Sequence, residues 1–140
     1  MAKGIETLIR LNDWRVDQKR RKLGNLLRLI EDFEAELKKL EQDLVSEQAA
    51  AAAAPNEGGF IYGHYADVVI QRRAIIQVSI QQLEKEANEA REEVSEAYRE
   101  LKKYETALEA RETREEAELA SKEQLELDEV GIRTFTQKIV

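Results

Sequence analysis

The residues that could carry chemistry are few and isolated along the chain. The only histidine, His64, has neither a second histidine nor an Asp/Glu cluster near it, so a surface residue is favoured over a metal ligand or an acid–base group. The absence of cysteine removes thiolate nucleophiles, thiolate metal sites and disulfides. No glycine-rich phosphate loop, nucleophile motif or EF-hand pattern occurs. The sequence therefore predicts a protein that is not an enzyme and has no cofactor or metal site.

Carboxylates are abundant, but they follow a helical pattern. Charged residues make up 36% of the chain and aromatic residues only 6%, with one proline and six glycines. This composition is typical of long helices. The glutamates fall mostly at exposed positions of a seven-residue repeat, which favours a solvated helix face over paired catalytic carboxylates. A two-helix rod also offers no concave pocket. Function is therefore expected on surfaces that bind partners.

The first predicted helix, at about 5–54, carries an apolar seam with seven-residue spacing. One series comprises Ile9, Val16, Leu23, Ile30, Leu37 and Leu44, and a second comprises Leu26, Phe33 and Leu40. Ile5 extends the second series, which Asn12 and Lys19 interrupt. A strict seven-residue repeat predicts a left-handed supercoil with a partner helix.

The second predicted helix, at about 62–130, carries its own seam. One series comprises Ile80, Ala87, Val94, Leu101 and Leu108, and the other comprises Ile76, Leu83, Ala90, Ala97 and Tyr104. The pattern weakens after Leu108. Folding the chain about residue 60, so that facing residue numbers add to about 120, sets Ile30 opposite Ala90 and Phe33 opposite Ala87. Large residues then face small ones.

The stretch between the seams predicts a reversal of the chain. Six alanines precede the only proline, Pro55, and two adjacent glycines follow it. Alanine is the best helix former, proline ends a helix and glycine permits a sharp turn. The sequence thus predicts an all-α fold, a monomeric antiparallel two-helix coiled-coil hairpin in a single domain, 1–140. The turn is expected at about 55–61, followed by a longer second helix and a tail at 131–140. A flexible linker and a dimer of two chains remain alternatives.

Charge is distributed unevenly. Residues 1–28 carry eight basic and three acidic side chains, whereas residues 84–130 carry seventeen acidic and eight basic ones. These segments lie side by side in an antiparallel hairpin, so mutual pairing is the favoured use of the basic run Arg15–Lys22. An acidic protein partner is the next alternative, and nucleic acid or anionic lipid is disfavoured because the acidic helix cancels the field. No segment resembles a secretory signal or a membrane span, which predicts a cytoplasmic location.

Three groups of apolar residues break the seam pattern and are candidate partner-binding sites. They comprise Leu8, Leu11 and Trp14 near the start, Tyr62, Tyr65 and Val69 after the turn, and the stretch Leu125–Phe135. An exposed Trp on a rod suggests a partner anchor. The alternatives are that Trp14 packs on Tyr104 or Leu108, that the Tyr62 group packs against the first helix, and that the last stretch is a frayed tail.

The last stretch also carries a resemblance. "KEQLELDEVGIRTF" (Lys122–Phe135) resembles the C-terminal signature of the FliJ family, small coiled-coil proteins of flagellar protein export. The Arg/Glu-rich run Ala107–Glu118 precedes it, as in that family, and Leu8–Leu44 resembles the family's Trp-bearing first helix. The likeness covers most of the chain. Gly131, where alanine would be usual, and the alanine-rich turn depart from the pattern, and Gly131 leaves the end of the second helix open.

The resemblance implies a stalk that binds two partners and couples them. The end carrying both termini would contact the hexameric export ATPase through Leu8, Leu11, Trp14, Arg15, Leu125, Leu127 and Val130. The start of the second helix would contact the cytoplasmic domain of the export-gate membrane protein through Tyr62, Tyr65 and Val69. Export chaperones are further partners, nucleic acid is not, and the protein would associate with the membrane only peripherally, through its partners.

Two other functions compete with this interpretation. The stalk of an injectisome-type secretion system is separated only by the C-terminal signature. A coiled-coil chaperone or holdase resembling prefoldin needs strands between its helices, and residues 55–61 are too few for a pair of strands.

Overall fold

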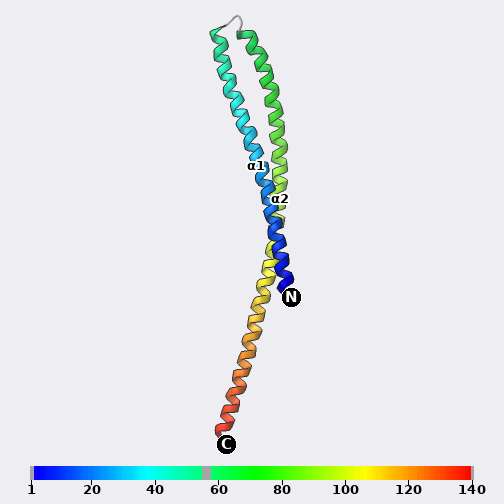
Figure 1. Cartoon of the computed structure of the whole chain (residues 1–140), viewed down its shortest axis with the longest axis vertical. Helices are drawn as coiled ribbons and strands as arrows, with labels where there is room; N and C mark the ends of the chain where they lie inside the picture. Colours follow the sequence, from blue (N-terminus) through cyan, green and yellow to red (C-terminus); the bar gives the residue numbers. More distant parts are fainter. Residues whose placement is uncertain (1, 55–57, 140) are drawn as a thin grey trace. The chain divides into compact units, whose positions relative to one another are not determined.

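The structure, a computed structural model, contains two long antiparallel helices (Figure 1). It describes residues 2–54 and 58–139, with side chains described for 3–54 and 61–138. Helix α1 spans Ala2–Ala53 and helix α2 spans Gly58–Ile139. The predicted all-α hairpin with a longer second helix is confirmed. That the whole chain forms a single coiled-coil domain stays a prediction.

The predicted bounds of the second helix were wrong at both ends. Helix α2 already includes 58–61, which were assigned to the turn, and it continues through Gly131 to Ile139, where a tail was expected. Residues 55–57 of the predicted turn lie outside the described residues. Gly131 adopts an ordinary helical backbone, and a Cβ built on it would meet no atom within 4 Å. A glycine in a helix interior weakens the helix by about 1 kcal/mol relative to alanine, which its helical neighbours outweigh here.

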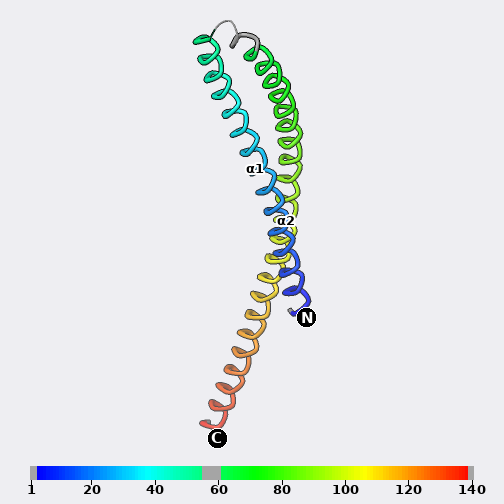
Figure 2. The backbone as a smooth tube through the Cα atoms, turned by 45° about the horizontal axis from the view of Figure 1, so that its top comes forward, coloured from blue at the N-terminus to red at the C-terminus, as the bar shows by residue number. Residues whose placement is uncertain are grey.

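The chain divides into two compact units, each built from part of both helices. The hairpin unit is Val16–Glu96, and the terminal unit is Met1–Arg15 with Ala97–Val140. In the hairpin unit the two helices run side by side in opposite directions (Figures 1 and 2). Interhelical ion pairs occur along this unit, from Arg73–Glu41 to Lys19–Glu93.

The core of the hairpin unit is a single seam between the two helices. Its buried apolar residues are Val16, Ile30, Val69, Ile76, Ala87 and Ala90. The half-buried residues of α1, which include Lys19, Leu23, Leu26, Phe33, Leu37 and Leu40, alternate with the buried ones at steps of three and four. This spacing keeps one stripe of a helix facing its partner. The predicted seams are therefore the ones that pack.

The predicted register of the seam was wrong by about one heptad. In the observed interhelical pairs Lys19–Glu93, Lys22–Glu93, Arg72–Glu36 and Arg73–Glu41, the two residue numbers add to between 108 and 115. These sums lie below the predicted value of about 120. Leu26, and not Phe33, is therefore level with Ala87, and Leu23, and not Ile30, is level with Ala90.

Electrostatics explains the observed register. A slide of seven residues keeps most seam positions apolar, so burial alone distinguishes poorly between the two registers. Charged residues beside the seam do not repeat so regularly. The observed register sets Arg72 within 2.7 Å of Glu36, whereas the predicted one would bring Glu36 level with the like-charged Glu84 and Glu86. Opposite charges beside a seam set the alignment of its helices.

The terminal unit has a short paired section and a long unpaired one. Asn12 and Leu101 are 3% and 5% exposed, and Ile5 and Leu108 are half-buried. In both of these pairs the two residue numbers add to 113. The amide of Asn12 donates a hydrogen bond from Nδ2 to the carbonyl oxygen of Leu8 at 2.7 Å. From residue 112 to 138 every side chain of α2 is exposed, and no other described segment of this unit lies beside it (Figure 2). We call residues 112–138 the overhang.

Adjacent isoleucines provide a test of the seam. Ile76 is 0% exposed, whereas Ile75 is 57% exposed on the outer face of the same helix. We expect Ile76→Ala to lower the free energy of unfolding by about 2–4 kcal/mol, because it removes buried methyl groups and leaves a cavity. Ile75→Ala should change it by less than about 0.5 kcal/mol. Urea unfolding followed by circular dichroism measures both, and equal losses in the two variants would contradict this seam.

Candidate interaction surfaces

The overhang of the terminal unit presents the largest group of exposed apolar residues. Large apolar side chains that are 56–67% exposed occur at six positions of this segment, namely Leu119, Leu125, Leu127, Val130, Ile132 and Phe135. The segment also carries eight acidic and four basic side chains. A surface that combines apolar residues with net negative charge is suited to a protein partner that has apolar contacts and basic neighbours.

Four of these apolar residues form two pairs on opposite faces of the overhang helix. Leu127 and Val130 are three residues apart and share one face, where they line a shallow groove with Glu123 and Glu126. Leu125 and Ile132 are seven residues apart, and at 100° per residue they lie on the other face. Ile132 belongs to the candidate stretch Leu125–Phe135, although it was not among the residues assigned to the ATPase contact. An apolar face on each side indicates a partner that contacts the helix from more than one direction.

The N-terminal candidates lie in the paired section of the terminal unit. Leu8 and Leu11 are 38% and 41% exposed, and Trp14 is 59% exposed. Arg15 is also exposed. Packing of Trp14 on Tyr104 or Leu108 could cover only the smaller part of its surface. These residues do not merge with the overhang candidates into one patch, because Leu125 follows the end of the paired section by about 21 Å of helix.

The candidates after the turn lie mostly inside the seam. Val69 is only 5% exposed, and Tyr62 and Tyr65 are half-buried. Partial burial, followed by the nearby carboxylates of Asp43 and Glu47, raises the pKa of the Tyr65 hydroxyl above its ordinary value. The alternative considered from the sequence, packing against the first helix, describes Val69 fully and the two tyrosines in part.

A second apolar stripe beside this seam was missed by the sequence analysis. Ile61, Val68 and Ile75 recur every seven residues and are 64%, 51% and 57% exposed, and Val78 follows three residues later at 65%. Heptad spacing puts these side chains on one outer face of α2. Residues 58–83 contain only three charged side chains, whereas residues 84–93 contain seven. Depletion of charge is a feature of interface cores, and it was visible in the sequence.

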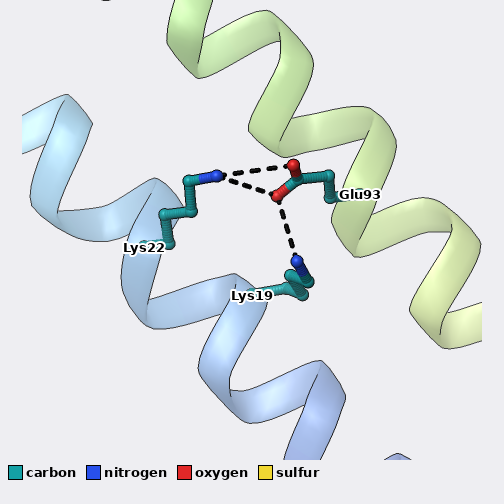
Figure 3. Close-up of polar contacts among 3 residues, drawn as sticks. All are labelled: Lys19, Lys22 and Glu93. Atoms are coloured by element: carbon teal, nitrogen blue, oxygen red, sulfur yellow. Dashed lines mark hydrogen bonds and ion pairs between the residues drawn. The ribbon is translucent and has the colours of Figure 1, made fainter.

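A charged cluster joins the two helices of the hairpin unit (Figure 3). The carboxylate of Glu93 accepts hydrogen bonds from the Nζ atoms of Lys22, at 3.1 Å to Oε2 and 3.4 Å to Oε1, and of Lys19, at 3.4 Å to Oε2. The hydrogen bond from Lys22 is the main cause that lowers the pKa of Glu93, with Lys19 contributing as well. We call these three residues the Glu93 clamp. Lys19 and Lys22 belong to the basic run Arg15–Lys22. Their pairing with the acidic helix is the use of this run that the sequence analysis favoured.

The other features of the described residues are those of long exposed helices. These residues contain no group of three or more His, Cys, Asp or Glu side chains placed to hold a metal ion. The main hollows on their surface are open grooves, such as the one between Leu27, Ile30 and Ala87. No described helix is long and apolar enough to cross a membrane. The recognisable features are exposed apolar stripes on long helices, and these define a coiled-coil interaction protein.

Comparison with known proteins identifies the family. The family model described as "Flagellar FliJ protein" matches residues 1–139. The chain therefore belongs to the flagellar FliJ family, whose proteins are linked to flagellum biogenesis and protein export, and the resemblance noted in the sequence is confirmed.

Curated relatives agree with this assignment. Flagellar FliJ proteins from two strains of Caulobacter vibrioides, NA1000 / CB15N and ATCC 19089 / CIP 103742 / CB 15, are each 29% identical to this chain over 133 residues. The alignment covers 95% of this chain and 95% of each relative. No solved structure matches the chain.

The Glu93 clamp predicts a pH dependence of stability. A carboxylate whose pKa is lowered by folding stabilises the folded state above its ordinary pKa, and this contribution is lost as pH falls through the lowered pKa. We therefore expect Glu93→Gln to lower the urea midpoint at pH 7 but to lower it much less at pH 3. The control is Glu92→Gln, which removes an exposed neighbouring charge. A gap between wild type and Glu93→Gln that is the same at both pH values would contradict this role.

Proposed function

We propose that this protein is a non-catalytic stalk of the flagellar export apparatus that binds the hexameric export ATPase through its terminal unit. It binds the cytoplasmic domain of the export-gate membrane protein near the start of α2. Membership of the FliJ family supports the export role. The observation that carries the proposal is the overhang, a helix exposed along its whole length with apolar side chains on two opposite faces.

The two-faced overhang suits a partner that surrounds it. A helix that binds one flat surface needs one apolar stripe, with polar residues opposite. Here Leu125 and Ile132 lie opposite Leu127 and Val130, and all four are more than half exposed. A ring of subunits can contact both faces at once, which a single groove cannot do. The net negative charge of the overhang would be matched by basic residues lining such a ring.

The N-terminal residues of the terminal unit would contribute a second ATPase contact. Leu8, Leu11 and Trp14 supply apolar area, and Arg15 supplies a charge that can pair with an acidic partner. These residues lie about 21 Å or more along the helix from Leu125. Two separated contacts on one partner would orient the stalk as well as hold it.

The gate contact is assigned to the first turns of α2. Tyr62 and Tyr65 keep part of their rings exposed, whereas Val69 supports them from within the seam. The stripe of Ile61, Val68 and Ile75 lies on an outer face of the same segment and adds apolar area free of charge. Its seven-residue spacing suits a partner helix that packs along α2. Export chaperones are further candidates for this charge-poor surface.

The proposed coupling is mechanical and needs no chemistry of the protein itself. A partner can shift a conformational equilibrium only through the difference in its affinity for the two states. A long helix that contacts an ATPase and a gate protein can transmit such a bias between them. The protein would then be cytoplasmic and associated with the membrane through its partners.

The ATPase contact can be tested with purified components. Adding this chain to the export ATPase should promote hexamer formation and raise ATP turnover. The triple variant Leu125→Ala/Leu127→Ala/Val130→Ala should reduce the apparent affinity at least about fivefold, because truncating apolar anchors removes much of an interface's energy. Size-exclusion chromatography with light scattering and a phosphate-release assay measure both effects.

A matched control for this test lies in the hairpin unit. Ile70→Ala/Val78→Ala removes apolar side chains that are 62% and 65% exposed, and it should leave ATPase binding unchanged. The stalk proposal is contradicted if the wild-type chain changes neither hexamer formation nor ATP turnover. If both double and triple variants lose binding equally, the overhang is not the contact.

The gate contact needs variants that spare the seam. We expect Tyr62→Ala/Tyr65→Ala and Ile61→Ala/Val68→Ala/Ile75→Ala each to weaken binding to the cytoplasmic domain of the gate protein, with little change in helicity. Isothermal titration calorimetry gives the dissociation constants. The control is Leu29→Ala, a 47% exposed leucine elsewhere in the hairpin unit. Unchanged gate affinity in both multiple variants would remove this assignment.

A further inference from the structure

One face of helix α1 combines positive charge with the only tryptophan of the chain. It is formed by exposed residues of the continuous helix Ala2–Ala53, namely Arg10, Trp14, Asp17 and Arg21. At 100° per residue, their steps of four, three and four residues keep them within about 60° of arc. The buried residues Asn12 and Val16 lie on the other side of the same helix. We call these four exposed residues the α1 stripe.

The overhang carries a stripe with the same spacing and the opposite charges. It is formed by four exposed residues, namely Glu115, Leu119, Lys122 and Glu126. Their steps are again four, three and four residues, so they also share one face of their helix. Leu119 lies in a shallow groove that Glu112, Glu115 and Glu116 line with it. We call these four residues the overhang stripe.

The two stripes are complementary at every position when they are aligned in the same direction. The matched pairs are Arg10–Glu115, Trp14–Leu119, Asp17–Lys122 and Arg21–Glu126. Three of these pairs join unlike charges, and the fourth joins two large apolar side chains. Unlike charges along a contact between helices favour both the partner and the alignment.

Neighbouring alignments of the two stripes are less favourable. A slide of seven residues in one direction would set Arg10 against Lys122, and in the other it would set Asp17 against Glu115. A slide of eleven residues toward the end of the overhang keeps three matches but loses the last ion pair, because Gln137 takes the place of its carboxylate. Charge thus favours one alignment.

The matched direction requires a second copy of the chain. Reversing one stripe would set the carboxylate of Asp17 against Leu119, which removes the charge from water without a partner. Within one chain, however, α1 and α2 run antiparallel (Figure 1). In the paired section the residue numbers add to 113, so Arg10 is level with residue 103 of its own chain and not with Glu115.

Several of these charges are available for such a contact. No hydrogen bond or ion pair to another described side chain is made by Arg10, Lys122 or Glu126. Asp17 pairs with Arg21 of its own helix at 2.9 Å, but the two side chains remain 54% and 71% exposed. Residues 1–28 are net basic and the overhang is net acidic, so the two segments attract each other over a longer range as well.

We propose that the α1 stripe of one copy binds the overhang stripe of a second copy, with the two helices parallel and Trp14 packed in the groove at Leu119. This contact goes beyond the stalk function, because its partner is the chain itself. Exposed ion pairs each contribute little, so the association has modest affinity and depends on salt. Trp14 also belongs to the surface proposed for the ATPase, and a chain paired in this way has that residue covered.

Charge reversal in the full-length chain tests the contact. Sedimentation equilibrium at low salt should show self-association that is lost near 1 M salt, where the Debye length is about 3 Å. Arg10→Glu/Arg21→Glu should weaken the low-salt association at least about tenfold, because like charges then meet at both ends of the contact. Glu115→Arg/Glu126→Arg should weaken it to a similar extent.

A mixture of the two charge-reversed variants supplies the decisive measurement. In the mixture each reversed stripe finds a partner stripe of unlike charge, so association should return to nearly the wild-type level. The control, Arg20→Glu/Lys38→Glu, makes the same change in net charge at exposed positions about 90° from the α1 stripe, and it should change the association little. A wild-type chain that stays monomeric at low salt overturns the proposal, and so does a mixture that fails to associate.

The single tryptophan reports the contact itself. As the chain concentration is raised at low salt, emission of Trp14 should move to shorter wavelength and its quenching by acrylamide should fall. Leu119→Ala should reduce both changes, whereas Leu125→Ala, a 66% exposed position outside the overhang stripe, should leave them as in the wild type. Self-association without any change at Trp14 would lie elsewhere on the chain and overturns the proposal.

Discussion

The structure depends on a seven-residue repeat of apolar side chains in each helix, which packs against the repeat of the other helix. Each helix offers a single stripe, and the two stripes cover each other in the seam that buries Ile30, Ile76 and Ala87. No second layer of structure stands behind this seam in the described residues. Because each helix packs against one other helix, large apolar residues off the stripe stay exposed to solvent. This explains the exposed apolar stripes on α2. In the described residues this arrangement leaves long exposed helix faces on both sides of one seam.

Charged residues select the register of the two helices, which the apolar repeat does not determine. A repeat specifies which face of a helix is buried, but it does not specify which heptad of α1 lies beside which heptad of α2. In the hairpin unit that choice falls to Glu93, Glu36 and Glu41 with their Lys and Arg partners. Surface ion pairs contribute little energy each, yet they select among alignments whose apolar contacts are nearly equal. The paired section of the terminal unit also contains a buried polar residue, Asn12, whose amide donates a hydrogen bond to a carbonyl oxygen of its own helix.

The different roles of the apolar repeat and the charged residues explain which features could be predicted from the sequence. Two helices, their seams and an exposed C-terminal section follow from periodicity and local propensity, and all three are found in the described residues. Residues 55–57 of the predicted turn lie outside those residues. The register does not follow, because Leu26 and Phe33 are interchangeable opposite Ala87 until the charges are aligned. For the candidate surfaces, Trp14 and the overhang leucines were recognisable as residues off the seam. Val69 is buried because the spacing of Tyr62, Tyr65 and Val69 coincides with seam positions, which was one of the alternatives for this group. The exposed heptad series of Ile61 was difficult to recognise among adjacent apolar residues.

Gly131 has a consequence for the last turns of the overhang. It has helical backbone angles and open space around its Cα, so packing within the chain gives no reason for a residue without a side chain. Glycine weakens the helix there, and the described contacts of the residues that follow lie within the helix itself, such as the ion pair between Arg133 and Glu129 and the hydrogen bond from Thr134 to the carbonyl oxygen of Val130. A segment of this kind can bend or partly unwind at small energetic expense. The last turns of the overhang are thus the part of helix α2 that can change its direction at the smallest cost in helix stability.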